Sequence, residues 1–557
     1  MSTWKLPEPR PAWARATAAF CLALTFLHPV SAGETSAARI RRHVTTLASD
    51  AFEGRAPGTA GETRTVSYLA EQFSALGLTP GNPDGTFFQD VPLVGITSDI
   101  TVTLTVGGET LVPRPVYDIS AESRRVTPRI EVPDTEIVFV GYGISAPEYG
   151  WDDYKGLDLR GKTLVMLIND PPVVTDEGSL DERMFRGRAM TYYGRWTYKY
   201  EMAARLGAAA CLIVHETGPA GYPFAVVGAS AGREQFDLRT EDGNRDRAAV
   251  EAWMTWDFSK RLFAAAGLDL ATLKAAAARP DFRPVVLPAQ ARYSVQNTLR
   301  DVRSRNVAAL LPGRDPSLNE YVVLTSHWDH LGRDPRLEGD QIFNGATDNA
   351  SGTAILLDVA ARLAALPPAE RPRRNLLFLS VTAEEMGLLG AKHYAANPLY
   401  PLARTVANVN LDGANHLAPT RDIEVIGWGA TTIEDIAAGV AQALGRTLTP
   451  DTQPEKGSYF RSDHFEFAKA GVPAFYSKAG RQPIDRPADY IDQKRAEYVS
   501  RHYHKVSDEV TEDWDFNATA QDSDFLFGLS RKLGDAADWP RWREGSEFKA
   551  RRDAMLR

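Results

Sequence analysis

Cysteine is almost absent from this chain, with only Cys21 and Cys211 among 557 residues. Cys21 lies in an N-terminal apolar run that we expect to be removed on export, which leaves Cys211 alone in the mature protein. A single cysteine cannot form an intramolecular disulfide, even in an oxidising compartment. Stability must therefore come from the size of the apolar core and from any metal that the protein binds.

Long apolar runs and concentrations of basic residues are also missing. Beyond the N-terminal run no stretch of about 18 apolar residues occurs, so no stable membrane span is expected. The formal net charge is −9 and no domain stands out as basic, which argues against a nucleic-acid partner. Repeats and low-complexity tracts are absent, and 43% hydrophobic with 24% charged residues is an ordinary globular composition.

The N-terminus has the features of a secretory signal peptide. Three basic residues precede the apolar run at 16–27, and small residues at 30–32 offer a cleavage site. The run is too short to cross a bilayer, which favours a cleaved signal over an uncleaved anchor. We expect residues 1–32 to be removed and the mature protein to be exported, either periplasmic or secreted.

The length of the chain predicts two or three domains. Residues 33–119 have helical spacing and are expected to begin the main domain. Short β-type runs bounded by Gly, Pro and Asp predict an inserted domain at 120–290. Strands and helices alternate over 291–540, which predicts an α/β fold with a mostly parallel mixed sheet and helices on both faces. Residues 541–557 are basic and are expected to form a short solvated tail.

Five short motifs combine His, Asp and Glu, and we expect each to lie at the end of a strand. Predicted strands at 321–325, 376–381 and 405–410 run into three of them, and a predicted helix at 351–366 follows another. Open α/β sheets bind ligands outside the carboxyl ends of their strands. Together the motifs predict a two-metal hydrolase. They are Ser326-His327-Trp328-Asp329-His330, Thr347-Asp348-Asn349-Ala350-Ser351-Gly352, Ala383-Glu384-Glu385, Asn410-Leu411-Asp412-Gly413 and Tyr503-His504.

Each motif also has an ordinary structural explanation. Asp348, just before a helix, is a good N-cap residue. Glu384 and Glu385 suit a solvated acidic pair that opens a helix. Asp412 precedes a glycine, as turn residues often do, and His504 suits a surface loop. What favours metal binding is the occurrence of all of them in one chain at successive element ends.

The residue types suit two divalent ions that share one carboxylate. Asp348 would bridge the ions, His327 and Asp412 would complete one site, and Glu385 and His504 would complete the other. Mixed nitrogen and oxygen donors suit two Zn²⁺ per chain best, with Mn²⁺ or Co²⁺ as alternatives. Two such ions would acidify a water shared between them and polarise a substrate carbonyl.

Two further acids complete this chemistry. Glu384, which points away from its neighbour Glu385, would act as general base and pass the proton to the leaving amine. Asp329 would orient His327 by accepting its second ring N–H. The scheme needs no covalent intermediate and makes no use of Cys211.

These motifs resemble the M28 family of metallopeptidases, zinc aminopeptidases that also include glutamate carboxypeptidase II and the glutaminyl cyclases. The resemblance implies that Asp348, in its Asp-Asn-Ala-Ser-Gly motif, is the bridging ligand. It also implies that Glu384 is the general base and Glu385 a ligand. The other matched positions are His327, Asp329, Asp412 and His504.

Further matches extend along the chain. Ser462-Asp463-His464 is similar to the family's Ser-Asp-His segment, and residues 50–59 are similar to the N-terminal signature of exported bacterial members. Tyr459 takes the place of an active-site tyrosine, and Tyr503 that of an oxyanion-binding tyrosine in the carboxypeptidase branch. A buried core tyrosine is the alternative for each. The insert resembles a protease-associated domain, with a purely structural spacer as the alternative.

We interpret the sequence as an exported dizinc aminopeptidase that acts on peptides with a free N-terminus. A carboxypeptidase of the same family would need cationic residues from the insert, and Arg186, Arg188 and Arg195 are available. A glutaminyl cyclase fits less well, because those enzymes use one metal and this chain keeps a two-metal set. A binding protein on a degenerate peptidase scaffold is disfavoured by the intact ligands and base.

Overall fold

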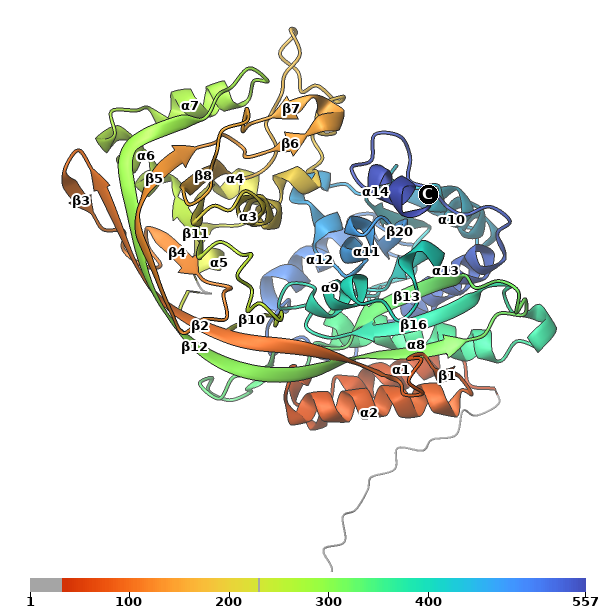
Figure 1. Cartoon of the computed structure of the whole chain (residues 1–557). Coiled ribbons are helices and arrows are strands. Elements are labelled where there is room, and N and C mark those ends of the chain that lie inside the picture. Colours follow the sequence, from red (N-terminus) through yellow and green to blue (C-terminus); the bar gives the residue numbers. More distant parts are fainter. Residues whose placement is uncertain (1–32, 229–230) are drawn as a thin grey trace, which may run out of the picture.

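Two long antiparallel strands, β2 (Phe88–Val106) and β12 (Val285–Leu311), run through the whole protein (Figure 1). β12 pairs with β16 at one end and with β5 at the other. We call residues 33–87 and 312–557 the large lobe, and residues 107–284 the insert lobe. The computed structural model describes residues 33–228 and 231–557, so the predicted signal peptide lies outside the described residues.

The large lobe continues the sheet beyond β12 in the order β16, β13, β17, β20, β18 and β19. β13 is parallel to both of its neighbours, β16 and β17, and β17 is parallel to β20. Two pairs are antiparallel: β12 with β16, and β20 with β18. The predicted mostly parallel, mixed sheet is confirmed. Its strands are β13 (Tyr321–His327), β16 (Asn375–Val381), β17 (Thr405–Asn410), β18 (Asp422–Ile426), β19 (Thr447–Pro450) and β20 (Ala474–Ala479).

Helices cover both faces of this sheet, as the sequence predicted. Leu324 of β13 lies in the core beneath α1, α2, α8, α10 and α13, whereas its neighbour Val323 packs on the opposite face with Phe467 of α11 and Tyr394 of α9. Burial on both faces explains why β13 is apolar throughout rather than alternating. The helices are α1 (Ser36–Leu47), α2 (Ala60–Ala75), α8 (Ser351–Ala364), α9 (Leu389–Ala396), α10 (Ile433–Ala443), α11 (His464–Lys469) and α13 (Phe516–Asp535).

The insert lobe extends the same sheet in the order β12, β5, β8, β9, β11 and β4. The strands β5, β8, β9 and β11 are parallel to one another, and helices pack against them. These elements are β4 (Ile119–Glu122), β5 (Arg129–Phe139), β8 (Thr163–Leu167), β9 (Ala210–His215), β11 (Val250–Thr255), α3 (Trp196–Arg205), α6 (Trp256–Ala265) and α7 (Leu270–Ala277).

The insert differs from the separate domain expected at residues 120–290. Its apolar core includes Val102 of β2 and continues into the large lobe at Tyr459 and Phe465. The expected boundaries therefore fall inside shared packing, and β12 already begins at Val285. The physical reason is that β12 is long enough to pair with strands of both lobes.

The C-terminal residues correct another expectation, because they do not form a solvated tail. Trp542 and Phe548 are buried, and α14 (Lys549–Met555) carries a buried arginine, Arg552. The Arg552 guanidinium donates to the backbone carbonyls of Leu402 at 3.0 Å and Thr405 at 2.8 Å. The basic composition suggested solvation, but two aromatic anchors and these carbonyl acceptors hold the segment on the large lobe.

Among the described residues, no helix is long and apolar enough to span a membrane.

Candidate metal centre

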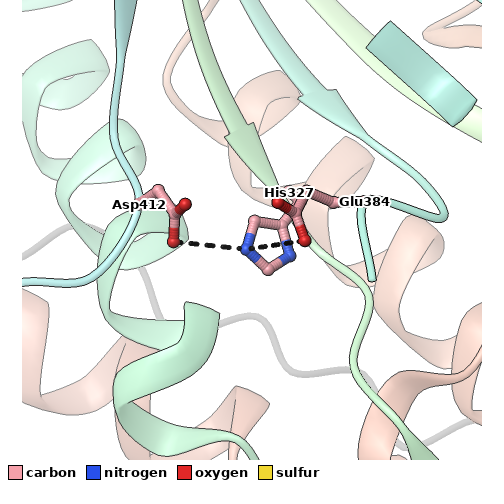
Figure 2. Close-up of side chains that lie close together, drawn as sticks. All are labelled: His327, Glu384 and Asp412. Atoms are coloured by element: carbon pink, nitrogen blue, oxygen red, sulfur yellow. Dashed lines mark ion pairs between the residues drawn. The ribbon is translucent and has the colours of Figure 1, made fainter. Parts of the chain in front are cut away.

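Three of the predicted site segments meet at one edge of the sheet. β13 lies between the parallel strands β16 and β17, so the carboxyl ends of all three strands point the same way. His327 is the last residue of β13, while Glu384 and Asp412 follow the other two strands. Figure 2 shows His327 between the two carboxylates, with Nε2 3.5 Å from Asp412 Oδ1 and 4.0 Å from Glu384 Oε2.

Asp348 and His504 reach this edge by other routes. Asp348 lies in the turn Ala346–Ala350 that leads into α8, where the sequence analysis placed it. His504 does not end a strand, which corrects the prediction. It follows helix α12 (Tyr490–Arg501) in a left-handed turn, with φ 57°, and its ring faces Asp348 and Glu385. The motif Tyr503-His504 is short and follows no apolar run, so the local sequence did not indicate that a helix precedes it.

The side chains form two groups that share Asp348. Its Oδ1 lies 3.3 Å from His327 Nε2, and its Oδ2 lies 3.3 Å from His504 Nε2. Asp412 Oδ1 is 3.5 Å from the first ring nitrogen, and Glu385 Oε2 is 3.0 Å from the second. Neither buried ring nitrogen has a hydrogen-bond partner among the described residues. Two unpartnered imidazole nitrogens that each face two carboxylate oxygens fit a pair of divalent ions with mixed ligands.

The charges of the ligand side chains depend strongly on one another. Burial acts to raise the pKa of Asp348, but His327 and His504 hold it well below its ordinary value. Burial and Asp348 likewise act to raise the pKa of Glu385, and the neighbouring His330 and His504 nevertheless lower it to about 2. Both carboxylates therefore stay ionised and require positive charge beside them, which metal ions would supply.

Glu384 has the opposite tendency. Burial, with repulsion from Asp412 and Glu385, raises its pKa well above the ordinary value, although His327 opposes this. Asp463 is buried nearby with neither carboxylate oxygen hydrogen-bonded to a described residue, and burial raises its pKa as well. A carboxylate with increased proton affinity is suited to accept a proton from a reacting group.

Asp329 has a different role from the one predicted. Its Oδ1 lies 3.7 Å from His327 Nδ1, too far for a hydrogen bond, and that ring nitrogen instead contacts the Asp329 backbone carbonyl at 3.2 Å. The buried Asp329 carboxylate accepts the backbone N–H of Glu384 at 3.1 Å and of Glu385 at 3.4 Å. It therefore positions the acidic pair, while the backbone orients the imidazole.

Asn349 explains why the motif after Asp348 contains an amide and a glycine. Its Nδ2 donates to the Leu411 carbonyl at 3.0 Å, and its Oδ1 accepts from the N–H groups of Gly352 at 2.9 Å and Gly413 at 3.0 Å. A Cβ at Gly352 would lie 2.6 Å from the Leu411 oxygen, so only glycine allows this approach. Asn349 thus connects the turn that contains Asp348 to the turn that carries Asp412.

Two contributing residues were not assigned from the sequence. His330 is buried, and its Nδ1 lies 2.6 Å from Glu385 Oε1. Its place three residues after His327 in the same motif was an available signal. Asp508 accepts the backbone N–H groups of Thr347 and of the residue after it, both at 3.1 Å. No local pattern points to Asp508, because its partners lie far away in the sequence.

The two predicted tyrosines occupy different places. Tyr503 stacks on His504, with 3.9 Å between the ring centroids, and so lies beside the predicted ligands. Tyr459 is buried against His464 at 4.6 Å, and its hydroxyl has no hydrogen-bond partner among the described residues. No described contact joins Tyr459 to a ligand side chain, so Tyr503 is the better placed of the two.

A parallel-sheet edge that gathers imidazoles and buried carboxylates from several turns defines a metal-binding α/β protein. Residues 306–525 match a protein-family model whose description is Peptidase family M28. This range contains all five predicted ligands and Glu384. Residues 306–525 therefore belong to this family, and the resemblance predicted from the motifs is confirmed.

Similar proteins match parts of the chain. Aminopeptidase NAALADL1 of Mus musculus is 35% identical over 127 residues, 22% of this chain and 15% of that protein. Aminopeptidase YwaD of Bacillus subtilis is 28% identical over 173 residues, 30% of this chain and 34% of that protein. A probable zinc metalloprotease of Leptosphaeria maculans is 37% identical over 94 residues, 17% and 20% of the two chains. The matches thus span about a third or less of these relatives.

Among solved structures, the aminopeptidase from Aneurinibacillus sp. strain AM-1 is similar with a TM-score of 0.46 and 20% sequence identity. That comparison covers 92% of this chain and 95% of the other.

Proposed function

We propose that this protein is an exported, zinc-dependent aminopeptidase with two metal ions per chain. The observation that carries the proposal is the shared carboxylate, since the two oxygens of Asp348 face the separate ring nitrogens of His327 and His504. Two aminopeptidases and a probable zinc metalloprotease among the similar proteins support the reaction and the metal. Export rests on the composition of residues 1–32.

The ligands divide between the two ions as their distances suggest. His327 and Asp412 would hold one ion, Glu385 and His504 the other, and Asp348 both. Zinc bound there would supply Lewis acidity that polarises a peptide carbonyl and lowers the pKa of water.

The protein's own side chains would move the proton and steady the developing charge. Glu384, with its raised pKa, would take a proton from the attacking water and deliver it to the nitrogen of the leaving amine. Asp329 would hold the backbone of Glu384 in place for both transfers. Tyr503, stacked on the His504 imidazole, would donate a hydrogen bond from its hydroxyl group to the oxyanion.

The proposal is tested with purified protein whose metal content is measured before and after chelation. Metal-free protein should regain hydrolysis when zinc is added, and peptides with a free N-terminus should be cleaved whereas N-acetylated copies are not. Cleavage of the acetylated copies from their C-terminal ends would overturn the aminopeptidase assignment.

A carboxypeptidase is the second candidate, and one residue of the insert lobe favours it. Arg195 is buried, its Nε has no partner, and its guanidinium forms no ion pair or hydrogen bond with any described side chain. Burial and the nearby Arg461 lower its pKa to about 10, so it is still charged at neutral pH. Because Arg195 also sits at the positive N-terminal end of α3, which has no acidic residue in its first turn, it would attract a substrate carboxylate.

The other two arginines considered for this role are already engaged between the lobes. Arg186 donates to the Trp428 carbonyl at 2.9 Å. Arg188 donates to the Thr452 carbonyl at 3.0 Å and pairs with Glu455 at 2.8 Å. A carboxypeptidase would therefore have to rely on Arg195, and amidation of the substrate C-terminus would abolish its activity.

A further inference from the structure

The segment before the first apolar strand contains a buried arginine for which neither the ligands nor the proposed reaction accounts. Arg55 ends the turn Asp50–Arg55 and is only 1% exposed, although it carries a formal charge. It precedes the first predicted ligand, His327, by nearly half of the chain's length. A buried guanidinium is costly unless its N–H groups are satisfied, so its partners reveal its role.

Arg55 donates four hydrogen bonds, all to backbone carbonyls. Nε donates to Trp328 at 2.9 Å, and Nη2 donates to Gly345 at 2.9 Å. Nη1 donates to Asn344 at 2.6 Å and to Leu47 at 2.7 Å. Trp328 directly follows His327, and the 344–345 backbone leads into the turn of Asp348. A single side chain therefore joins the two backbone segments that present the shared ligand and its first imidazole.

The conformation of the turn Asp50–Arg55 brings the Arg55 side chain close to these backbone carbonyls. Gly54 has φ 65°, and a Cβ there would lie 2.3 Å from the Gly332 oxygen and 2.6 Å from the Phe343 oxygen. Only glycine can lie so close to both carbonyls. Asp50, at the start of the same turn, accepts a hydrogen bond from the Asn344 side chain at 2.9 Å.

The charge of Arg55 and its hydrogen bonds have opposite consequences for a bound metal. Burial lowers its pKa to about 10, against the influence of Asp329, Asp508 and Asp348, so Arg55 is cationic at neutral pH. A cation beside a metal site weakens metal binding by repulsion. Hydrogen bonds that fix the ligand-bearing backbone strengthen metal binding by reducing the reorganisation that binding requires. The sign of the change on removing Arg55 therefore distinguishes the two effects.

We propose that Arg55 is a positioning residue that pre-organises the backbone of His327 and Asp348 for metal binding. This inference rests on the metal centre of the proposed function, but it does not depend on the reaction catalysed there. It assigns a role to residues 50–55, which have no ligand of their own.

The test compares Arg55→Met and Arg55→Lys with Arg64→Met. Arg64 lies on the same N-terminal segment, but it is exposed and donates only to Ala51 and Glu53 within the turn. Zinc affinity is measured by competition with a coloured chelator, and thermal stability is measured on the metal-free proteins. We expect Arg55→Met to bind zinc about 10- to 100-fold more weakly, as for other residues that support ligands.

Arg55→Lys should remain about 10-fold weaker, because an ammonium cannot reproduce the planar fork of a guanidinium. Arg64→Met should bind zinc like the unaltered protein. Co²⁺-loaded Arg55 variants should also show an altered visible spectrum, which a loss of global stability alone would not produce. Zinc binding by Arg55→Met that equals or exceeds the unaltered affinity would overturn the proposal.

A measurement on the unaltered protein covers the case in which the Arg55 variants do not fold. Zinc should increase the protection of residues 50–58 from hydrogen exchange, while α7 in the insert lobe should not respond. Unchanged protection of residues 50–58 on zinc binding would also overturn the proposal. If affinity depends on Arg55 but no peptide is hydrolysed, the inference stands and the proposed function fails. If hydrolysis requires zinc but affinity ignores Arg55, the reverse holds.

Discussion

The sheet edge of the large lobe that carries His327, Asp348 and His504, which we call the metal edge, differs from the interior of the insert lobe in how buried polar groups are paired. In the insert lobe, buried Lys199 donates to two backbone carbonyls, and Arg247 pairs with Asp237 at 2.8 Å. At the metal edge, the ring nitrogens of His327 and His504 have no hydrogen-bond partner among the described residues. The described residues contain two overlapping sets of His and carboxylate side chains that could hold a metal ion, and both lie at this edge: His327, Glu384 and Asp412, and His327, Asp348 and Glu385.

This difference supports the proposal that the chemistry takes place at the edge formed by His327, Asp348 and His504. Leaving a buried polar group unpaired costs about 1–3 kcal/mol, so a protein tolerates several together chiefly where a ligand will pair them. Buried charged groups of the insert lobe such as Lys199 and Arg247 have hydrogen-bond or ion-pair partners, which indicates that this lobe mainly supports the fold. Arg195 Nε and Glu251 Oε1 are exceptions, since neither has a hydrogen-bond partner among the described residues, and Arg195 lies near Arg461 of the large lobe.

Removing the shared carboxylate should give the largest effect. Asp348→Ala is expected to reduce the metal content from two ions per chain to less than one. Hydrolysis should fall at least about 10⁴-fold, because several kcal/mol of transition-state stabilisation are lost. Metal analysis and peptide assays check this. Asp237→Asn, a buried carboxylate of the insert lobe, should lower the melting temperature but keep both ions. Two ions per chain in Asp348→Ala would contradict the bridging role.

Changing the proposed base should affect the reaction without affecting the metals. Glu384→Gln is expected to lower kcat by about 10²- to 10⁴-fold while both ions remain bound. Steady-state kinetics with metal analysis on the same samples measures this. Glu251→Gln, which alters a buried carboxylate of the insert lobe, should change kcat by less than about twofold. Undiminished turnover in Glu384→Gln would remove Glu384 from the mechanism.

Arg195 provides the test of whether the insert lobe only supports the fold. Arg195→Met should lower kcat/KM about tenfold for short peptides with a free C-terminal carboxylate, the loss of one charged hydrogen bond. C-terminally amidated copies should be unaffected. Arg183→Met is the control, since Arg183 is exposed and pairs with Asp181 at 2.9 Å. Equal losses on free and amidated peptides would mean that Arg195 does not bind a carboxylate.

The smallest expected effect concerns the pH dependence of stability in the insert lobe. Burial raises the pKa of Glu251 to about 7, although Arg247 opposes this. The folded state therefore keeps a proton that the unfolded state releases near its ordinary pKa of 4.5. Stability from this group is complete below pH 4.5 and is lost as pH rises through 7, on the order of 3 kcal/mol.

Glu251→Gln should remove this contribution to the decline. Urea unfolding at several pH values between 4.5 and 8, on both proteins with the same zinc content, compares the two slopes. Identical slopes would show that Glu251 is not protonated in the folded state. Glu177→Gln, at an exposed position, is the matched control and should leave the slope unchanged.

Local patterns in the sequence were sufficient for much of the large lobe. The predicted strands that run into His327, Glu384 and Asp412 correspond to β13, β16 and β17, and the helix after Asp348 corresponds to α8. They were predictable because apolar runs and the turn residues that end them depend on neighbours in the chain. Parallel pairing then brings their carboxyl ends together without further information.

The sequence by itself thus determined which His, Asp and Glu residues are candidate ligands, their order in the chain and the class of sheet that carries them. Only the tertiary structure decided the contacts beside the predicted ligands: Arg55 donates to the carbonyls of Trp328 and Gly345, and Asp508 accepts the backbone N–H of Asp348. It also decided that one strand, β12, serves both lobes and that Arg195 Nε has no hydrogen-bond partner among the described residues. These contacts join residues that lie far apart in the chain, and they follow from packing, which no local pattern records.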